Sequence, residues 1–138
     1  RVDRESLPNV TFSAPLPKEQ IVRVFEASDV CMTIFKNVPI LRTCSPNKLF
    51  DSLAAGRPVL TNMPGWLGDI AVDDKTGVLV EPDNPIAFAD RVTWMVDHPD
   101  ELAEFSKNAR ALAQARFERG ALAHKLEAVL SSAVDQHQ

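Results

Sequence analysis

Short apolar runs that alternate with amphipathic segments are the feature that most constrains the fold of this chain. The run Val30–Phe35 ("VCMTIF") is almost continuously apolar and of strand length, and β-rich runs follow at Pro58–Thr61 and Thr76–Pro82. Continuous apolar runs are typical of strands that are covered on both faces in a parallel sheet. Strands that alternate with helices indicate an α/β fold with a parallel sheet and right-handed crossovers.

The remaining elements follow from apolar spacing and from start signals. A further short strand is expected within "NVTFSA", at about Val10–Phe12, ahead of the first helix. Asn84 followed by Pro85 is typical of a helix cap and first helical position. The tail of the chain is expected to be purely helical. The helices are expected at Lys18–Ser28, Ser45–Ala55, Leu67–Val72, Pro85–Val96, Asp97–Phe117 and Arg119–Val134, the last with an apolar stripe of Leu122, Leu126, Val129 and Leu130.

The composition fits one ordinary globular domain and argues against several classes of partner. The chain has 138 residues, of which 45% are hydrophobic and 25% charged, enough for one core. Its net charge is −4 and its basic residues form no run, which favours a small anion or a neutral ligand over nucleic acid. No apolar run approaches the roughly 20 residues that span a bilayer, and the polar start has no signal-peptide core. Cys31 and Cys44 show neither metal-ligand spacing nor a disulfide framework, so we expect a reducing, cytoplasmic location.

The stretch "SPNKLFDSLAAGRPVL" carries the chemistry that can be identified from the residues alone. Ser45 is a favoured N-cap and Pro46 fits the first helical position. A helix N-terminus that follows a parallel strand offers free N–H groups and partial positive charge to a phosphate, and Lys48 would add to that field. The alternative is that Lys48 is solvated or pairs with Asp51 three residues on.

At 100° per residue, the polar residues of this helix fall on one face. Asn47, Lys48, Asp51 and Ser52 share that face, whereas the leucines and Phe50 cover the other. Asp51 could accept hydrogen bonds from the vicinal hydroxyls of a ribose, as carboxylates do in nucleotide-binding folds. The alternative is an exposed helix acid with no ligand.

Three segments, in this order and spacing, resemble the C-terminal nucleotide-sugar-binding domain of retaining GT-B glycosyltransferases of family 4. They are "NVTFSAPLPKEQIVRVFEASDVCMTIF", "SPNKLFDSLAAGRPVLTN" and "TGVLVEPDNPIAFADRV". The resemblance covers nearly the whole chain, and the second segment looks most like enzymes of bacterial surface-polysaccharide assembly, such as those of lipopolysaccharide or capsule. It implies a Rossmann-like parallel sheet with flanking helices, and a nucleoside-diphosphate sugar as donor substrate with no further cofactor and no required metal.

The resemblance also implies roles for individual residues. In the family a Glu-x7-Glu motif ends on this helix, and Asp51 stands at the second acid, which binds the donor ribose. Thr43 stands at the first acid, and because it is no carboxylate that role is not transferred. The loop and helix start between the two acids hold the diphosphate, chiefly through backbone N–H groups, and the base is contacted near the end of the "NVTF" strand. These positions correspond to Cys44, Ser45, Pro46, Asn47 and Lys48 for the diphosphate and to Ala14–Leu16 for the base; no catalytic residue is identified.

Family members carry further parts ahead of the "NVTF" strand, namely an acceptor-binding domain, a Gly-rich loop and a basic pair. Residues 1–138 are therefore expected to be the donor-binding part of a longer enzyme and to be inactive alone. The glycan or lipid-linked acceptor is expected to bind the other domain. Peripheral membrane association of the full-length enzyme is left open. In the family's strand order 3-2-1-4-5-6, Val10–Phe12 and Val30–Phe35 are not neighbours. We expect an unpaired strand edge, covered by strand swapping, by a homodimer or by residues outside this chain.

Two alternative hypotheses for the function remain open. A non-catalytic Rossmann-like binding or regulatory module would share the fold without the chemistry, and a sugar-nucleotide epimerase of the GT-B class would share the ligand. Trp66 and Asp69, in the loop after the Pro58–Thr61 strand, are candidates for a sugar contact or, alternatively, for a core anchor and a helix cap.

Overall fold

The structure, a computed structural model, describes residues 7–135 and contains a three-stranded parallel sheet. The strands are β1 (Cys31–Thr33), β2 (Val59–Thr61) and β3 (Gly77–Leu79), in the order β1-β2-β3. Thr33 pairs with Thr61, which pairs with Leu79, so the carboxyl ends of all three strands lie at one edge of the sheet. The predicted α/β fold with a parallel sheet is confirmed.

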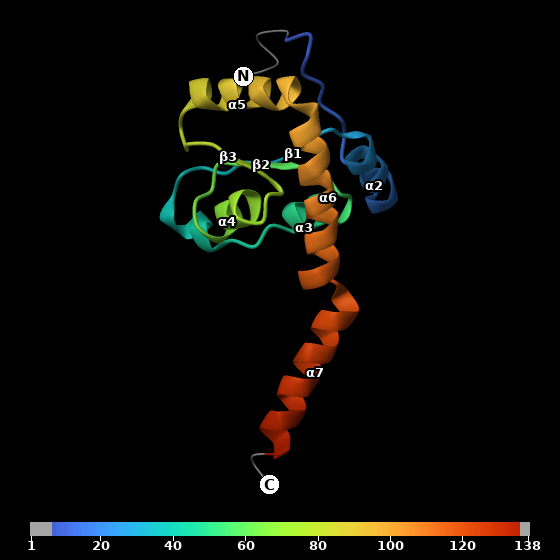
Figure 1. The fold of residues 1–138 in the computed structure, drawn as a ribbon. Coiled ribbons are helices and arrows are strands. Elements are labelled where there is room, and N and C mark those ends of the chain that lie inside the picture. The colour runs from blue at the N-terminus through green and yellow to red at the C-terminus, as the bar shows by residue number, and fades with distance from the viewer. Residues whose placement is uncertain (1–6, 136–138) are drawn as a thin grey trace.

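Helices cover both faces of the sheet (Figure 1). Helices α3 (Asn47–Ala54) and α4 (Trp66–Val72) lie on one face, and α5 (Pro85–Asp97) lies on the other. Helix α6 (Pro99–Arg116) runs along one side and packs on α3, and α2 (Lys18–Ala27) also contacts α3. The sheet is therefore the middle layer of three.

Successive residues of β2 point to opposite faces and so belong to two different cores. Val59 joins a buried cluster with Leu49 and Leu53 of α3, residues of α4, and Ala109 and Ala113 of α6. Leu60 joins a second cluster with Val78, Val80 and Met95. The site-bearing helix α3 is thus fixed between the sheet and α6.

The predicted start of α5 is confirmed in detail. Asn84 is the N-cap, and its side-chain oxygen accepts a hydrogen bond from the Ala87 N–H at 2.9 Å, with Pro85 in the first turn. The short helix expected after β2 is present as α4, and the turn into it passes through Gly65 at a φ of +85°. The helices α6 and α7 (Arg119–Asp135) also match their expected positions.

Helix α7 projects away from the rest of the domain (Figure 1). Its predicted apolar stripe is exposed: Leu122, Leu126, Val129 and Leu130 retain between 44% and 66% of their accessible surface. The pattern predicted the helix correctly, but the described residues provide nothing for the stripe to pack against.

Three expectations about the first third of the chain are corrected. Val10–Phe12 is not a strand, because the described residues contain no neighbouring strand to pair with it, and Phe12 is 72% exposed. The loop after β1 contains a 3₁₀ helix, η1 (Pro39–Thr43), that the sequence pattern did not predict. The strand β1 is shorter than Val30–Phe35 and is covered unevenly, since Met32 is 55% exposed between buried Cys31 and Thr33.

Within residues 7–135, β1 pairs only with β2, so its other edge has no strand partner. This is the unpaired edge that the expected strand order requires. The Cys31 thiol in this strand is buried, and burial raises its pKa, in keeping with an unreactive thiol.

Candidate functional site

Helix α3 begins one residue later than the sequence predicts. Pro46 has extended backbone angles, with φ −78° and ψ 122°, so it is the N-cap, and no side chain caps the helix. The expected N-cap Ser45 therefore lies one residue outside the helix and is exposed. Leu49 donates its N–H to the Pro46 carbonyl at 3.0 Å, which is the first backbone hydrogen bond of the helix. The N–H groups of Asn47 and Lys48 come before it and have no partner within the helix. The helix start thus offers unpaired donors without a side-chain cap in the way.

The polar face of α3 is smaller than predicted. Ser52 is 1% exposed and donates its hydroxyl to the Lys48 carbonyl at 2.6 Å, so it belongs to the interior and not to the exposed face. Asn47, Lys48 and Asp51 are exposed. A serine hydroxyl can donate to the backbone carbonyl four residues earlier in its own helix. This bond lets a serine be buried where the helical wheel places it near solvent.

Lys48 neither pairs with Asp51 nor extends freely into solvent. Its Nζ lies 4.8 Å from the centroid of the Phe35 ring, within the range of a cation–π interaction. The ion pairs of the described residues join Arg116 to Asp74 and His124 to Glu127. The ammonium group is therefore held on the side of α3 that faces the end of β1.

Asn47 and Asp51 line a cavity of about 420 Å³ between α3 and the end of α6. The same cavity is bordered by Lys18 at the start of α2 and by Arg110 of α6. The Arg110 guanidinium also donates to the Ala54 carbonyl at the end of α3. The other lining residues are Phe50, Ala54, Ala113, Gln114, Phe117, Glu118 and Arg119. Two exposed carboxylates, of Asp51 and Glu118, thus share a cavity with three basic side chains, a setting suited to a polar, partly anionic ligand.

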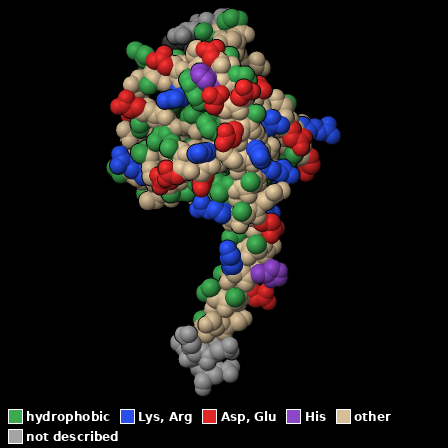
Figure 2. Space-filling view, in the orientation of Figure 1, with side chains coloured by type: hydrophobic (Ala, Val, Ile, Leu, Met, Phe, Trp, Pro, Cys, Tyr) green, Lys and Arg blue, Asp and Glu red, His purple; other side chains and the backbone are tan. Residues whose placement is uncertain are grey.

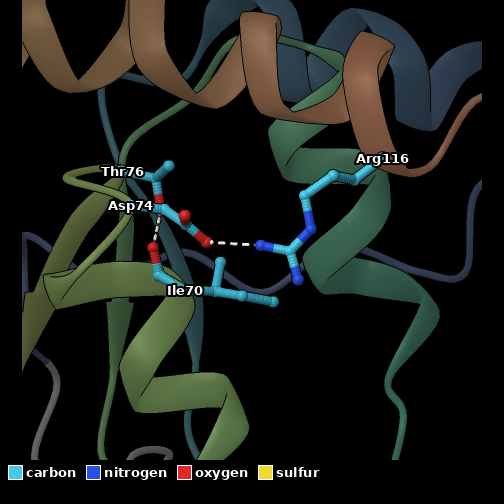
Figure 3. A network of polar contacts seen from close by, with 4 residues as sticks. All are labelled: Ile70, Asp74, Thr76 and Arg116. Carbon is cyan, nitrogen blue, oxygen red and sulfur yellow. Dashed lines mark hydrogen bonds and ion pairs between the residues drawn. The ribbon is translucent and has the colours of Figure 1, made fainter.

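A salt bridge fixes the end of α6 that borders this cavity (Figure 3). Arg116 contacts the Asp74 carboxylate at 3.0 Å, with both side chains partly exposed. In the same turn Thr76 donates its hydroxyl to the Ile70 carbonyl at 2.7 Å and is fully buried. The last turn of α6 is thereby tied to the connection between α4 and β3.

A second cavity, of about 570 Å³, lies at the carboxyl ends of the strands. Phe35 and Lys36 follow β1, Asn62 follows β2, and Glu81 and Asp83 follow β3 around it. In open α/β folds ligands bind outside the carboxyl ends of the strands. The ammonium group of Lys48, in the first turn of α3, reaches this edge at the Phe35 ring.

The remaining predicted site residues lie outside the linings of these two cavities. Thr43 ends η1, is exposed, and donates its hydroxyl to the Ile40 carbonyl at 3.2 Å. Cys44 and Pro46 are half-buried, and Leu16 is half-buried just before α2. The structure thus brings Asn47 and Asp51 together and places Thr43, Cys44, Ser45 and Pro46 on the segment that leads into α3.

Trp66 packs at the rim of the core. Its ring is stacked with that of Phe50 at 6.2 Å between centroids, and Phe50 in turn meets Phe117 edge-on at 4.9 Å. Asp69 is exposed in the first turn of α4. The core-anchor interpretation of Trp66 therefore agrees with its contacts.

Sequence reasoning missed the cavity residues contributed by other elements. Arg110 of α6 and Phe117, the residue that ends α6, lie far from α3 along the chain, and nothing in their local pattern links them to it. Asn62 offered a weak signal, because it is a polar residue directly after an apolar strand and is 7% exposed. The positions of these residues depend on tertiary packing.

The charges elsewhere are mixed, and the described part of the chain shows no metal site. Acidic and basic side chains alternate over the face in Figure 2, with no large patch of one sign. Among residues 7–135 no group of three or more His, Cys, Asp or Glu side chains could hold a metal ion. No helix in the same residues is long and apolar enough to cross a bilayer.

Comparisons with known proteins agree with this geometry. The family described as "Glycosyl transferases group 1" matches residues 3–112. The D-inositol 3-phosphate glycosyltransferase of Corynebacterium diphtheriae is 33% identical over 124 residues, which are 90% of this chain and 28% of that protein. A provisionally named teichuronic acid biosynthesis glycosyltransferase of Bacillus subtilis, TuaH, is 37% identical over 59 residues, 42% of this chain and 15% of that protein.

The fold also matches a solved structure. Sucrose-phosphate synthase from Thermosynechococcus elongatus superposes with a TM-score of 0.82 and 24% identity over 98% of this chain and 33% of that one. The chain thus spans about a third or less of the length of these proteins.

Proposed function

The chain belongs to the glycosyl transferases group 1 family, and from this we propose that it is the donor-binding part of a retaining glycosyltransferase of the family 4 type. The enzyme would transfer a sugar from a nucleoside-diphosphate sugar to a glycan or lipid-linked acceptor. The observation that carries the proposal is the cavity that unites Asn47 and Asp51 with Lys18 and Arg110.

Asp51 is proposed to bind the donor ribose. Its carboxylate is exposed on the cavity side of α3 and forms no ion pair within the described residues. An ionised carboxylate accepts hydrogen bonds from two adjacent hydroxyl groups without changing its protonation state. Asn47, one turn earlier on the same cavity, would contact the same part of the ligand.

The diphosphate is proposed to lie at the start of α3. The backbone N–H groups of Ser45, Asn47 and Lys48 would face it, with Pro46 fixing the turn between them, and the Lys48 ammonium would add a positive charge. Cys44 would line the same segment without donating, because its N–H is bonded to the Leu41 carbonyl at 3.2 Å. Charge builds on the diphosphate as the bond to the sugar breaks, so fixed positive groups there lower the barrier. Thr43, at the end of η1, would lie where the transferred sugar meets the leaving group, without supplying an acid.

The base is proposed to contact the segment Ala14–Leu16, which ends two residues before Lys18 at the start of α2. This support is positional, because Lys18 borders the same cavity as Asp51. Neither a metal nor a cofactor other than the donor is part of the proposal.

The acceptor, the location and the assembly are part of the proposal in broader terms. We place the enzyme in the cytoplasm, with both cysteines as free thiols. The acceptor would bind a part of the enzyme beyond these residues, and the chain alone would be inactive. Surface-polysaccharide assembly at the inner face of the membrane is favoured by the resemblance of the α3 segment and by the relative named for teichuronic acid biosynthesis. The unpaired edge of β1 would be covered by those further residues, by strand swapping or by a second copy.

Isothermal titration with nucleoside diphosphates and their sugars tests this function. We expect the polypeptide that contains these residues to bind nucleotides of one base, and we expect Asp51→Ala to weaken that binding at least tenfold. Removing two charge-assisted hydrogen bonds has an effect of this size. Asp90→Ala, which removes an exposed acid from α5, serves as the matched control and should bind as the wild type does. Binding that is unchanged by Asp51→Ala, or absent for every nucleotide, would favour the non-catalytic module instead.

A further inference from the structure

The side chains of Thr61 and Asn62 hold the segment that follows β1 beside the end of β2. Thr33 and Thr61 are the final backbone partners of β1 and β2, and the Thr61 hydroxyl donates to the Thr33 carbonyl at 2.9 Å. The next residue, Asn62, bonds to the backbone of Phe35 through its side-chain amide. Its amide nitrogen donates to the Phe35 carbonyl at 2.8 Å, and its amide oxygen accepts from the Phe35 N–H at 2.9 Å.

The Asn62 side chain therefore acts like one more residue of the β1–β2 ladder. It is 7% exposed, so both of its bonds are partly shielded from water. A buried amide that satisfies both a donor and an acceptor of one neighbouring residue fixes that residue in position and orientation. Phe35 is the residue it fixes.

The Phe35 ring is half-buried against the core cluster that contains Leu49 of α3, and the Lys48 Nζ lies 4.8 Å from its centroid. A lysine at a helix start is opposed by the helix dipole, and an exposed lysine loses rotamer entropy when it is ordered. The face of an aromatic ring offsets part of both costs because it attracts the ammonium group and covers the aliphatic stem.

We propose that Asn62 and Phe35 position Lys48. The Asn62 amide locks the backbone of Phe35 at the carboxyl end of β1, and the Phe35 ring holds the Lys48 ammonium beside the first turn of α3, where a diphosphate would lie. Phe35 and Asn62 are positioning residues and touch no reacting atom. This inference rests on the proposed function, because it takes the donor diphosphate as the partner of Lys48.

The geometry can be tested without any ligand. In the polypeptide labelled with [ε-¹³C]lysine, the ε-methylene protons of Lys48 should show an upfield ring-current shift, which Phe35→Leu removes and Phe35→Tyr keeps. Asn62→Asp retains the acceptor for the Phe35 N–H and loses the donor, so it should reduce the shift while the protein stays folded. Phe88→Leu removes the other ring of the same cavity and is the matched control. A Lys48 resonance that is unchanged by Phe35→Leu overturns the proposal.

The consequence for binding is tested by a double-mutant cycle on Phe35 and Lys48. With the tightest binder among UDP, GDP, CDP and ADP, Phe35→Leu should weaken binding about two- to fivefold, the range of a surface cation–π interaction. The same change should have no effect when Lys48 is already alanine. Phe35→Tyr should bind as the wild type does. Equal losses in both backgrounds would mean that Phe35 acts only through folding, which overturns the positioning role.

This failure can be told apart from failure of the proposed function. If none of the nucleotides binds, or if Asp51→Ala and Lys48→Ala both leave binding unchanged, the proposed function is wrong and the role of Phe35 is wrong with it. If Asp51→Ala weakens binding and Lys48→Ala does not, ribose binding stands and the diphosphate partner of Lys48 is wrong. If both weaken binding and the cycle shows no coupling, the proposed function stands and only the positioning role is wrong.

Discussion

At the scale of single residues, Gly77 sets how closely β2 and β3 can approach. A side-chain carbon at position 77 would lie 1.8 Å from the carbonyl oxygen of Val59, its partner in the parallel ladder. No neighbouring side chain can move to relieve this contact, because the clashing atom belongs to the backbone of a central strand. Only glycine fits at this position.

We expect Gly77→Ala to lower the free energy of unfolding by more than about 3 kcal/mol, as measured by chemical denaturation. Gly120→Ala is the control, because the nearest atom to a side-chain carbon there, at 3.1 Å, is an exposed side-chain oxygen of Glu118 and not backbone. This change should not destabilise the protein, since alanine favours a helix over glycine. A Gly77→Ala protein as stable as the wild type would contradict the register of β2 and β3.

How much of the site could be predicted from sequence differs from residue to residue. Asn47 and Asp51 were identified correctly as exposed neighbours, because a helical period of 100° per residue fixes which side chains share a face. The partner of Lys48 could not be predicted, because Phe35 reaches it only through the packing of β1 against α3. Ser52 was misplaced because a hydroxyl can satisfy itself on its own helix, a choice that helical spacing does not encode.

At the scale of elements, the start of α7 depends on one carboxylate. Glu118 accepts hydrogen bonds from the N–H groups of Gly120 at 2.8 Å and Ala121 at 2.6 Å. These bonds favour the ionised form and lower the pKa of Glu118 below its usual value of 4.5. The cap therefore stabilises α7 above the pKa of an unfolded glutamate and is lost as the pH falls through the lower, folded value.

The amide resonances of Gly120 and Ala121 should report this titration in an NMR series from pH 7 to pH 2. We expect both to move with one midpoint below 4.5, and the change to disappear in Glu118→Gln. A Glu118 midpoint at or above 4.5 would show that the cap is not formed in solution.

The order of the elements could be predicted more fully than their ends. Helices α2, α4, α5, α6 and α7 and the three strands lie where periodicity and start signals indicate, because those signals are local. Val10–Phe12 has the composition of a strand, but a strand also needs a partner, and none is present within the described residues. The 3₁₀ helix η1 has no periodic signature of its own at its length of 5 residues.

At the scale of the whole molecule, the core and α7 are separate in structure. The buried hydrophobic residues of the described chain end at Ala113, and the partly buried ones packed against them end at Phe117. Helix α7 extends beyond this core with its apolar stripe exposed (Figure 1). Fold stability and the orientation of α7 should therefore be independent.

Removal of residues 120–138 should shift the thermal unfolding midpoint of the domain by no more than about 2 °C, because few buried contacts are lost. Leu53→Ala gives the scale for a core change, since Leu53 is fully buried and its truncation costs about 2–5 kcal/mol. If removing α7 destabilises the domain as much as Leu53→Ala does, α7 packs on the core in solution and its described exposure is wrong.

The central claim is that the start of α3 and the adjoining face of Asp51 bind a nucleoside diphosphate. The most direct measurement is an amide chemical-shift titration of the polypeptide that contains these residues with the nucleotide it binds best. We predict that the largest changes fall on Cys44, Ser45, Asn47, Lys48 and Asp51, with smaller ones at Lys18 across the cavity. Changes confined to the β3–α5 edge around Asp83, or no change at saturating nucleotide, would contradict the claim.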